Sequence, residues 1–556
     1  MAASKPISIL FSLKKLNTVL STDRKDIGVV YMFAILGGMV QLSLPLGIQS
    51  IISFVMAGSL STSIVVLIGM VVFGVFINGL LQIRQQQIIE KVKQKLFVRY
   101  SLEYSDRLPK LNIEKLDKEY LPEMVNRYFD SVSLQKGLDK LLIDLPAAVI
   151  QVILGLLLLS YYHPIFIAFG VMLLVIVVVV IRFTSPNGLE TAMKASTYKY
   201  GVAAWLQEVA RTIKTFKYTK GTSLHMNQTD TLVSSYLGSR TNHFKVLLSQ
   251  FWSLVTFKII ITAAMLIIGS YLLVNQQINV GQFIAADIVI IAIIGSIEKL
   301  ITNLDTMYEA LVSVEKLSVI TEAETEESGT LELASLNKGV SVVFKDVSFA
   351  YSDGNRVLNN INFTILPGQV VQLKGVSGAG KSTVLRLLTG AFKNYSGNIL
   401  LEDVPAGNYQ VESLRKRTGI LLGSQDIFYG SIWNNLTMGN EACDIKEVTE
   451  LVSLTGLDVY VQSCKEGYDT LLQPVGNKLS NNVRKNILLV RALIGEYRLL
   501  LLEEPFEHLT GEQKSKLINY IKKEKHASVI IASADDGIKS YCDKVICLSK
   551  EGEIIG

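Results

Sequence analysis

The sequence is short of charged residues. Lys, Arg, Asp and Glu make up 19% of the 556 residues, against about 25% in an average soluble protein. Hydrophobic residues make up 49% and the mean hydropathy is +0.36, as expected if several long stretches carry no charge. This composition argues against a wholly soluble, a disordered or a fibrous protein.

Cysteine and histidine are also scarce, and neither has a metal-binding spacing. Cys443, Cys464, Cys542 and Cys547 all lie in the last quarter, without a CxxC pair or a nearby pair of histidines. The pattern therefore gives no indication of a zinc site. We interpret the four cysteines as reduced, buried thiols of a cytosolic domain.

The net charge of +5 is unevenly distributed. Residues 1–316 carry 29 basic and 20 acidic side chains, residues 317–340 carry one and five, and residues 341–556 carry 24 of each. The basic excess therefore belongs to the hydrophobic half and not to a basic patch on a soluble domain. We expect no nucleic-acid partner.

Six segments are apolar enough to cross about 30 Å of hydrocarbon, which takes about 20 residues. Their approximate bounds are 28–57, 63–83, 145–162, 164–183, 251–274 and 279–297. The fourth, with the run MLLVIVVVVI, is the clearest, and the first contains Pro45, where we expect a kink. Because six such segments occur together, we interpret residues 1–320 as an all-α transmembrane domain in a lipid bilayer, and not as a buried soluble core.

Lys and Arg lie on one side of the predicted membrane. They recur in the amino terminus and in the two long connections, whereas the turns around 58–62, 161–163 and 275–278 contain no charged residue. By the positive-inside rule both termini are cytoplasmic. The long connections have a helical period, so we expect helices that extend well below the membrane. The run 7–13, followed by Lys14 and Lys15, predicts an amphipathic helix on the inner leaflet and not a signal peptide.

A few polar side chains fall within the predicted spans. Lys258 and Asp287 lie in the fifth and sixth spans and Arg182 lies at an inner edge. The uncharged ones are Gln41, Gln49, Asn78 and Gln151. Because exposing charge to lipid costs several kcal/mol, these groups either line a polar pathway or bond neighbouring helices, and the sequence favours neither.

The pattern changes after an acidic linker at 321–340. From 341 to 556 short apolar runs alternate with helical segments, which predicts an α/β domain. Residues 370–374 are expected to form a strand and residues 384–388 a helix. The turn between them, GVSGAGKST, fits the phosphate-loop pattern GxxxxGK[ST] in full.

Each residue type in this turn has a physical role. Glycines let backbone N–H groups approach phosphate oxygens, the lysine reaches the β and γ phosphates, the serine holds Mg²⁺, and the following helix N-terminus favours anions. The expected nucleotide-binding residues are Gly375, Val376, Ser377, Gly378, Ala379, Gly380, Lys381, Ser382 and Thr383. ATP and Mg²⁺ are the predicted cofactors.

With these features the chain resembles the ATP-binding cassette (ABC) exporters, specifically a half-transporter with a six-helix membrane domain followed by one nucleotide-binding domain. The resemblance implies that Tyr351 in SFAY stacks on adenine and that Gln425 in GSQD links Mg²⁺ to the membrane domain. LSNNV at 479–483 stands at the family signature LSGGQ, and LLLLEE stands at the hydrophobic strand that ends in two acids. Ser480 would then bind phosphate, Glu503 Mg²⁺, and Glu504 the attacking water.

Several departures from the family pattern concern hydrolysis. The signature has lost both glycines and the glutamine, Glu503 replaces an aspartate, and Ala534 in IIASAD stands where the family has its switch histidine. An alanine side chain cannot hydrogen-bond γ phosphate. The sequence therefore predicts ATP binding, with hydrolysis that is slow or depends on a partner.

The resemblance also implies a partner, since the family's sites form between two nucleotide-binding domains. We expect a homodimer or heterodimer of half-transporters in a bacterial inner membrane, exporting an unidentified substrate. The 27 residues before the first span are too few for a peptidase domain, so we do not expect leader-peptide processing. The alternative interpretation is a membrane-embedded ATP sensor or regulatory subunit without turnover.

Overall fold

The structure is a computed structural model that describes residues 9–58, 62–116, 120–335, 338–352, 354–476, 478–524 and 526–555. The predicted external turn around 58–62 therefore lies largely outside the described residues. The chain forms two compact units. Unit 1 comprises Met1–Pro109 and Glu119–Ala323, and unit 2 comprises Lys110–Lys118 and Glu324–Gly556.

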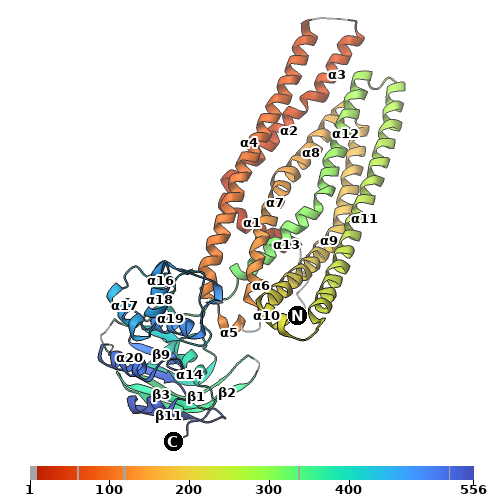
Figure 1. The fold of residues 1–556 in the computed structure, drawn as a ribbon. Coiled ribbons are helices and arrows are strands. Elements are labelled where there is room, and N and C mark those ends of the chain that lie inside the picture. Colours follow the sequence, from red (N-terminus) through yellow and green to blue (C-terminus); the bar gives the residue numbers. More distant parts are fainter. Residues whose placement is uncertain are drawn as a thin grey trace. The chain divides into compact units, whose positions relative to one another are not determined.

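Unit 1 is helical over its described residues (Figure 1). Its helices are α1 (Ile9–Leu20), α2 (Arg24–Gln41), α3 (Ser43–Met56), α4 (Thr62–Arg107), α6 (Leu121–Asn126), α7 (Asp130–Asp139), α8 (Leu145–Tyr162), α9 (Ile165–Arg211), α10 (Ile213–Tyr218), α11 (Leu224–Val274), α12 (Val280–Thr302) and α13 (Leu304–Thr321).

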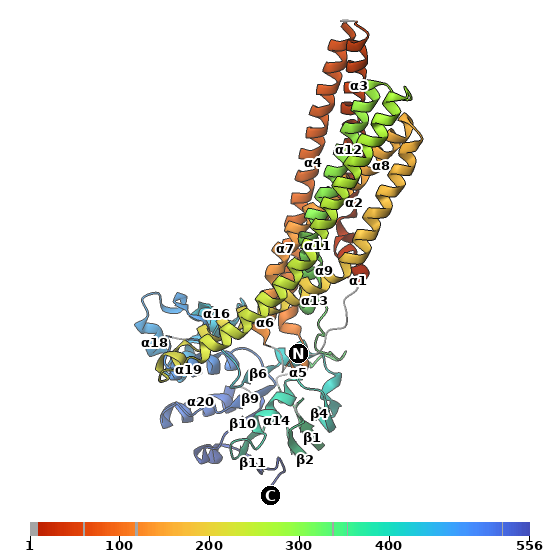
Figure 2. The same cartoon turned by 90° about the vertical axis from the view of Figure 1, so that its right-hand side faces the viewer.

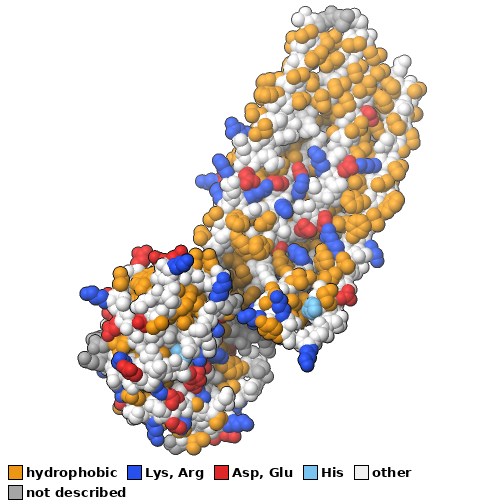
Figure 3. Space-filling view, viewed as in Figure 1, with side chains coloured by type: hydrophobic (Ala, Val, Ile, Leu, Met, Phe, Trp, Pro, Cys, Tyr) orange, Lys and Arg blue, Asp and Glu red, His pale blue; other side chains and the backbone are white. Residues whose placement is uncertain are grey.

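Among the described residues, five helical stretches are long and apolar enough to cross a membrane. They contain five of the six predicted spans. The fourth span lies in α9, where several side chains between 174 and 186 are outside the described ones. Hydrophobic side chains cover one end of the helical unit, and charged side chains gather toward the other end (Figure 3).

Three helices are much longer than a membrane span requires. Helices α4, α9 and α11 have 46, 47 and 51 residues, where about 20 would cross the bilayer. At about 1.5 Å per residue each is roughly 70 Å long. These helices therefore continue well past the predicted spans, and the cytoplasmic location of the extensions stays a prediction.

The first span is broken close to its proline. Helix α2 ends at Gln41 and α3 begins at Ser43, so the break precedes Pro45 by about one turn. Proline has no N–H to donate to the carbonyl group four residues earlier, and its ring crowds that carbonyl. The interruption expected at Pro45 thus falls at Leu42, next to the Gln41 carbonyl that would otherwise accept a hydrogen bond from residue 45.

Helix α1 packs on α13 with a mixed side, on which Leu16 and Leu20 are buried beside Ser12. Leu10 and Phe11 are 79% and 52% exposed. On the other side the Ser12 hydroxyl donates to Glu315 Oε1 (3.0 Å), and Lys15 Nζ lies 3.0 Å from Glu315 Oε2. The placement of α1 on the inner leaflet stays a prediction.

Three of the seven polar groups named in the spans bond to a neighbouring helix. The pairs are Tyr162 Oη to Gln49 Oε1 (2.7 Å), Ser296 Oγ to Gln151 Oε1 (2.8 Å) and Lys258 Nζ to Glu298 Oε2 (2.7 Å). These contacts support the second alternative, hydrogen bonding between helices, for the three residues named from the sequence. Asp287 is half-buried on α12, and the Arg182 side chain lies outside the described ones.

Unit 2 is an α/β domain. Its strands are β1 (Val342–Ala350), β2 (Arg356–Ile365), β3 (Val370–Gly375), β4 (Tyr395–Leu401), β5 (Val404–Pro405), β6 (Thr418–Leu421), β7 (Gly430–Ser431), β8 (Leu471–Leu472), β9 (Leu499–Glu503), β10 (Ser528–Ala532) and β11 (Lys544–Leu548). Its helices are α5 (Ile113–Leu116), α14 (Lys381–Leu388), α15 (Val411–Lys416), α16 (Ile432–Thr437), α17 (Ile445–Leu454), α18 (Asp458–Ser463), α19 (Asn481–Leu493) and α20 (Gly511–Glu524).

The central sheet of unit 2 is parallel, with strand order β11-β3-β10-β9-β6. A second, antiparallel sheet has the order β2-β1-β4-β5, and both sheets and α14 are visible in Figure 2. Ala532 on β10 pairs with Leu373 on β3 and with Glu503 on β9. Because parallel strands end at the same sheet edge, the segments that follow β3, β9 and β10 lie side by side.

The cysteines differ from the expectation in one respect. All four are free, as predicted, but each is partly exposed and none is fully buried. Cys443, Cys464 and Cys542 pack at the margin of a hydrophobic cluster whose centre is filled by leucine, isoleucine and valine. The prediction that the thiols are buried is therefore wrong, because these positions border the hydrophobic core and keep part of their surface exposed.

Candidate nucleotide-binding site

The phosphate loop leaves β3 and enters α14 through two glycines with left-handed backbone. Gly378 has φ +85° and Gly380 has φ +90°, angles that glycine adopts without steric cost. A Cβ at Gly380 would also stand 2.6 Å from Leu358 Cδ2. Helix α14 begins at Lys381, three residues before the predicted start, because the left-handed Gly380 already turns the chain into the helix.

The loop borders a cavity of about 510 Å³ at the carboxyl ends of the parallel strands. The predicted residues that line it are Tyr351, Ser377, Gly378, Ala379, Gly380, Lys381, Ser382, Thr383, Glu503 and Glu504, together with Ala534. Free N–H groups at the start of α14 favour an anion here. The cavity therefore suits a phosphorylated ligand.

The lysine of the loop folds back over the segment that precedes it. Lys381 Nζ donates to the carbonyl oxygens of Gly375 (2.7 Å) and Val376 (3.2 Å). These two residues form the base of the loop and do not line the cavity themselves. The ammonium group is thus held at the loop, where it can exchange carbonyl partners for phosphate oxygens.

Tyr351 stands at the side of the cavity, held by α14 and by two aromatic rings. Its hydroxyl lies 3.1 Å from Thr383 Oγ1 and accepts a hydrogen bond from Arg386 (3.2 Å). The rings of Phe349 and Phe392 meet it edge-on. These contacts fix the ring plane, which is what a stacking platform requires.

Glu503 bonds directly to the serine of the phosphate loop. The Ser382 hydroxyl donates to Glu503 Oε1, and the Gly423 N–H donates to Oε2 over 2.7 Å. A hydroxyl and a carboxylate oxygen in contact fit the all-oxygen ligand preference of Mg²⁺. The additional methylene of Glu503, relative to aspartate, does not prevent this side chain from reaching Ser382.

Gln425 lies in a neighbouring cavity of about 310 Å³ that shares Glu503 and Glu504 with the first. Its Oε1 accepts the N–H of Leu422 over 3.1 Å. The side chain is therefore occupied by its own loop and does not line the phosphate-loop cavity.

Glu504 has a strained backbone and a firmly held carboxylate. Its φ is +43°, a left-handed value that costs a residue with a side chain about 1–2 kcal/mol. The Ser533 hydroxyl donates to Oε2 (2.6 Å) and the Ala534 N–H donates to Oε1 (3.3 Å). Sequence reasoning missed Ser533, although a hydroxyl next to the missing histidine was a visible signal.

Ser480 caps helix α19 and lies outside the phosphate-loop cavity. Its hydroxyl oxygen accepts the N–H of Val483 over 3.3 Å, with extended backbone at φ −65°, ψ 152°. Ser480 is therefore the N-cap of α19, and its predicted contact with phosphate stays a prediction. Asn481, the next residue, lines the 310 Å³ cavity.

His508 is a second residue that the sequence did not single out. It lines the 310 Å³ cavity, and its Nε2 lies 2.6 Å from Asn486 Oδ1. Burial, reinforced by Lys485, lowers the pKa of His508 to about 4. The imidazole is therefore neutral at physiological pH.

Comparison of the sequence with models of known protein families shows which family the chain belongs to. Residues 27–297 match the model of the ABC transporter transmembrane region, and residues 358–507 match the ABC transporter model. The chain belongs to the ABC transporters and has the domain order of an exporter half-transporter. It is a multi-pass integral membrane protein, and the predicted fold class, a helical membrane domain followed by an α/β phosphate-loop domain, is confirmed.

Individual relatives cover parts of the chain. It is 30% identical over 265 residues to the alpha-hemolysin translocation ATP-binding protein HlyB of Escherichia coli O157:H7, covering 47% of this chain and 37% of that protein. It is 26% identical over 298 residues to the ATP-dependent lipid A-core flippase of Syntrophus aciditrophicus, covering 53% and 49%. The chain thus spans about half, or less, of the length of these curated relatives.

A solved structure matches over nearly the whole chain. A bacterial Atm1-family ABC exporter with ATP bound superposes with a TM-score of 0.85, covering 97% of this chain and 95% of that one at 18% identity. At this identity the match shows that the two proteins share a fold.

Proposed function

We propose that the protein is an ATP-driven exporter whose nucleotide-binding unit binds ATP well and hydrolyses it slowly. One observation carries this proposal: the phosphate loop, the Ser382–Glu503 contact and the Glu504 carboxylate converge at the ends of three neighbouring parallel strands. Phosphoryl transfer needs this combination of anion cradle, metal ligands and water-positioning carboxylate.

Each residue of the site has an assigned role in this proposal. The loop 375–383 holds the phosphates, with Lys381 at the β and γ groups, and Tyr351 stacks on adenine. Ser382 and Glu503, with Gln425 after a rotation of its side chain, would hold Mg²⁺. The ion, when bound, neutralises charge that develops on the transferred phosphoryl group. Glu504 orients the attacking water.

Two features support slow turnover. Ala534 offers only its backbone N–H, which already bonds to Glu504, so no side chain from this position reaches γ phosphate. Loss of one such polar contact typically costs about 3 kcal/mol, or about a hundredfold in rate. In the signature, Ser480 keeps its cap, but the side chains of Asn481 and Asn482 add bulk where glycines would let phosphate approach.

We infer that the working unit is a dimer, since Ser480 caps its helix outside the phosphate-loop cavity of its own chain. In a heterodimer, each composite site would combine the phosphate loop of one chain with the signature of the other. This chain departs from the family pattern in both parts, so even a partner with the full family motifs would leave one departure in each site. The proposed location is a bacterial inner membrane with both termini in the cytoplasm.

Nucleotide binding is tested by Lys381→Ala in the full-length protein in lipid nanodiscs. We expect ATP affinity to fall by at least tenfold, because the cation at the β and γ phosphates is lost. Lys416→Ala, an exposed lysine of α15 in the same unit, is the matched control and should bind as wild type. Unchanged binding in Lys381→Ala would disprove the phosphate-loop assignment.

Turnover is tested by Glu504→Gln in the same preparation. The exporter proposal predicts a slow ATPase that vanishes in this variant while ATP binding persists. A membrane-embedded sensor would bind ATP with no ATPase activity in either protein. The second result would replace the exporter proposal by the sensor.

A further inference from the structure

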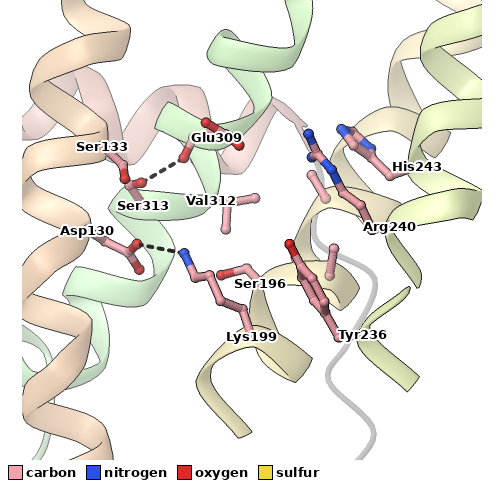
Figure 4. A pocket seen from close by; sticks show the side chains of 12 residues that line it. Asp130, Ser133, Ser196, Lys199, Tyr236, Arg240, His243, Glu309, Val312 and Ser313 are labelled. Carbon is pink, nitrogen blue, oxygen red and sulfur yellow. Dashed lines mark hydrogen bonds and ion pairs between the residues drawn. The ribbon is translucent and has the colours of Figure 1, made fainter. Parts of the chain in front are cut away.

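Unit 1 contains a polar cavity whose lining residues, between 130 and 313, all precede the nucleotide-binding domain in the sequence. It has a volume of about 90 Å³ and lies among helices α7, α9, α11 and α13 (Figure 4). One water needs about 10–15 Å³ of such space, so the cavity can hold several waters or a small polar molecule. Polar and charged side chains make up most of its lining.

The inner part of the cavity has buried polar atoms that lack partners. Asp130 is 3% exposed, and its Oδ2 makes no hydrogen bond among the described residues, nor does the buried Oγ of Ser196. Burial raises the pKa of Asp130. An unsatisfied buried polar group costs about 1–3 kcal/mol, more when charged. Atoms of this kind around an open cavity indicate that something polar occupies it.

The charged side chains of the cavity are separated by sign. Asp130 on α7 and Glu309 on α13 form an acidic wall, and Lys199 on α9 and Arg240 on α11 form a basic wall (Figure 4). Lys199 Nζ forms an ion pair with Asp130 Oδ1 at 3.7 Å, longer than a hydrogen bond, and Asp130 Oδ2 has no hydrogen-bond partner among the described residues (Figure 4). The walls therefore face each other without being fully paired.

The residues behind the basic wall hold it in place. His243 is fully buried, with Nδ1 at 2.9 Å from Thr191 Oγ1 and Nε2 at 2.9 Å from Asp305 Oδ1. Arg240 lies 3.5 Å from the other oxygen of Asp305. The guanidinium group is thus positioned at the cavity and keeps donors available for a ligand.

The location of the cavity favours a water-soluble ligand. Its α9 residues, 192–199, follow the predicted end of the fourth span at residue 183. At about 1.5 Å per residue they lie roughly 14–24 Å further along the helix. A lipid headgroup would remain near the end of the span, so the ligand should come from the aqueous phase.

We propose that this cavity binds a small zwitterion that carries one ammonium and one carboxylate group, as a free amino acid does. The ammonium group binds Asp130 Oδ2, which has no hydrogen-bond partner among the described residues, and faces Glu309. The carboxylate accepts hydrogen bonds from Lys199, Arg240 and the Ser196 hydroxyl. This inference depends on unit 1 alone and does not require the nucleotide-site proposal.

The probes are glycine, N-acetylglycine, which lacks the ammonium, and glycinamide, which lacks the carboxylate. Binding is measured by calorimetry on the full-length protein in nanodiscs up to about 10 mM, a range that covers millimolar affinities. We expect glycine to bind at least tenfold more tightly than either blocked probe. Equal binding of all three probes, or no binding of glycine, would overturn the proposal.

Two variants test which wall of the cavity binds the ammonium group and which binds the carboxylate. In Asp130→Asn glycine should bind no better than N-acetylglycine, and in Lys199→Gln it should bind no better than glycinamide. Lys194→Gln is the matched control, because Lys194 lies on the same helix but pairs with Glu190 outside the cavity (2.7 Å). Wild-type discrimination in both wall variants would contradict the assignment.

Folding and nucleotide binding are checked in the same samples. Asp130→Asn keeps the shape of the side chain and removes a buried charge, so its melting temperature should not fall. If ATP binds normally while glycine does not bind to the wild type, the zwitterion site is wrong and the nucleotide site stands.

Discussion

At the scale of single residues, the proposed function makes the Glu504 carboxylate and its neighbours the groups that set the rate of ATP turnover. Ser533 and the Ala534 N–H hold this carboxylate, but no side chain at position 534 reaches the phosphate side. We therefore expect Ala534→His to raise the ATPase rate by about tenfold to a hundredfold. Ala534→Leu adds bulk without a hydrogen-bonding group and is the control. A folded, ATP-binding Ala534→His protein with an unchanged rate would contradict this account.

Ser533 is expected to act as a positioning residue through Glu504. A hydrogen bond to a charged group contributes about 1.5–3 kcal/mol, so Ser533→Ala should lower kcat roughly tenfold or more. The dissociation constant of ATP should not change, because Ser533 does not line the phosphate-loop cavity. Ser533→Thr keeps the hydroxyl and should rescue kcat. A loss of ATP binding in Ser533→Ala would instead indicate a structural role.

Lys316 gives unit 1 a pH-dependent stability. It is 8% exposed, and burial lowers its pKa to about 8 from 10.5, with Arg127 adding to the effect. Between these two values the unfolded chain binds the proton and the folded chain does not, so stability rises with pH. The total effect is at most about 3 kcal/mol. Lys316→Met removes a buried charge, so its melting temperature at pH 7 should be higher than that of the wild type. The wild-type melting temperature should rise between pH 8 and 10, and most of that rise should be absent in the variant. An equally steep increase in the variant would show that another group is responsible.

The sequence was sufficient to find the residues that belong to one local motif. The phosphate loop could be recognised because its glycines and its lysine are adjacent in the chain. Ser533 had only the local signal of a hydroxyl beside Ala534, and His508 and the proposed zwitterion cavity had none. Their partners, Glu504, Asn486 and the residues of four helices, are brought together only by the fold.

At the scale of elements, helix length and helix breaks were the predictable features. The 3.6-residue period predicted long extensions, and the missing N–H of Pro45 predicted an interruption. Boundaries were less accurate, as the early start of α14 at Lys381 shows, because a cap depends on backbone angles that composition does not fix. The association of α5 with unit 2 had no local signal at all.

Helix α5 is held to unit 2 by a carboxylate. Glu114 accepts hydrogen bonds from Asn394 Nδ2 (2.6 Å) and from the Lys393 N–H (3.4 Å). Since 110–118 lies in the chain between helices of unit 1, we expect this contact to transmit changes in nucleotide state.

Glu114→Ala should leave ATP affinity unchanged and reduce stimulation of the ATPase by reconstitution into lipid. Glu412→Ala, an exposed carboxylate of α15, is the control. Full stimulation in Glu114→Ala would mean that α5 does not couple the units.

At the scale of the whole molecule, the scarcity of charge and the basic excess have one explanation. The predicted spans carry few charges, and the basic residues of unit 1 lie mostly in the amino terminus and in the long connections. The α/β unit is electrically balanced, with 24 residues of each sign from 341 to 556. A chain with this distribution is an integral membrane protein that carries an ABC nucleotide-binding unit.

The most direct test is to measure ATP occupancy and ATP turnover on one sample of the full-length protein reconstituted in lipid. We predict that ATP saturates the site and that turnover is roughly 0.1 per second, about a hundredfold below the median enzyme value of about 10 per second. Saturation with turnover near 10 per second, or failure to bind ATP, would contradict the account.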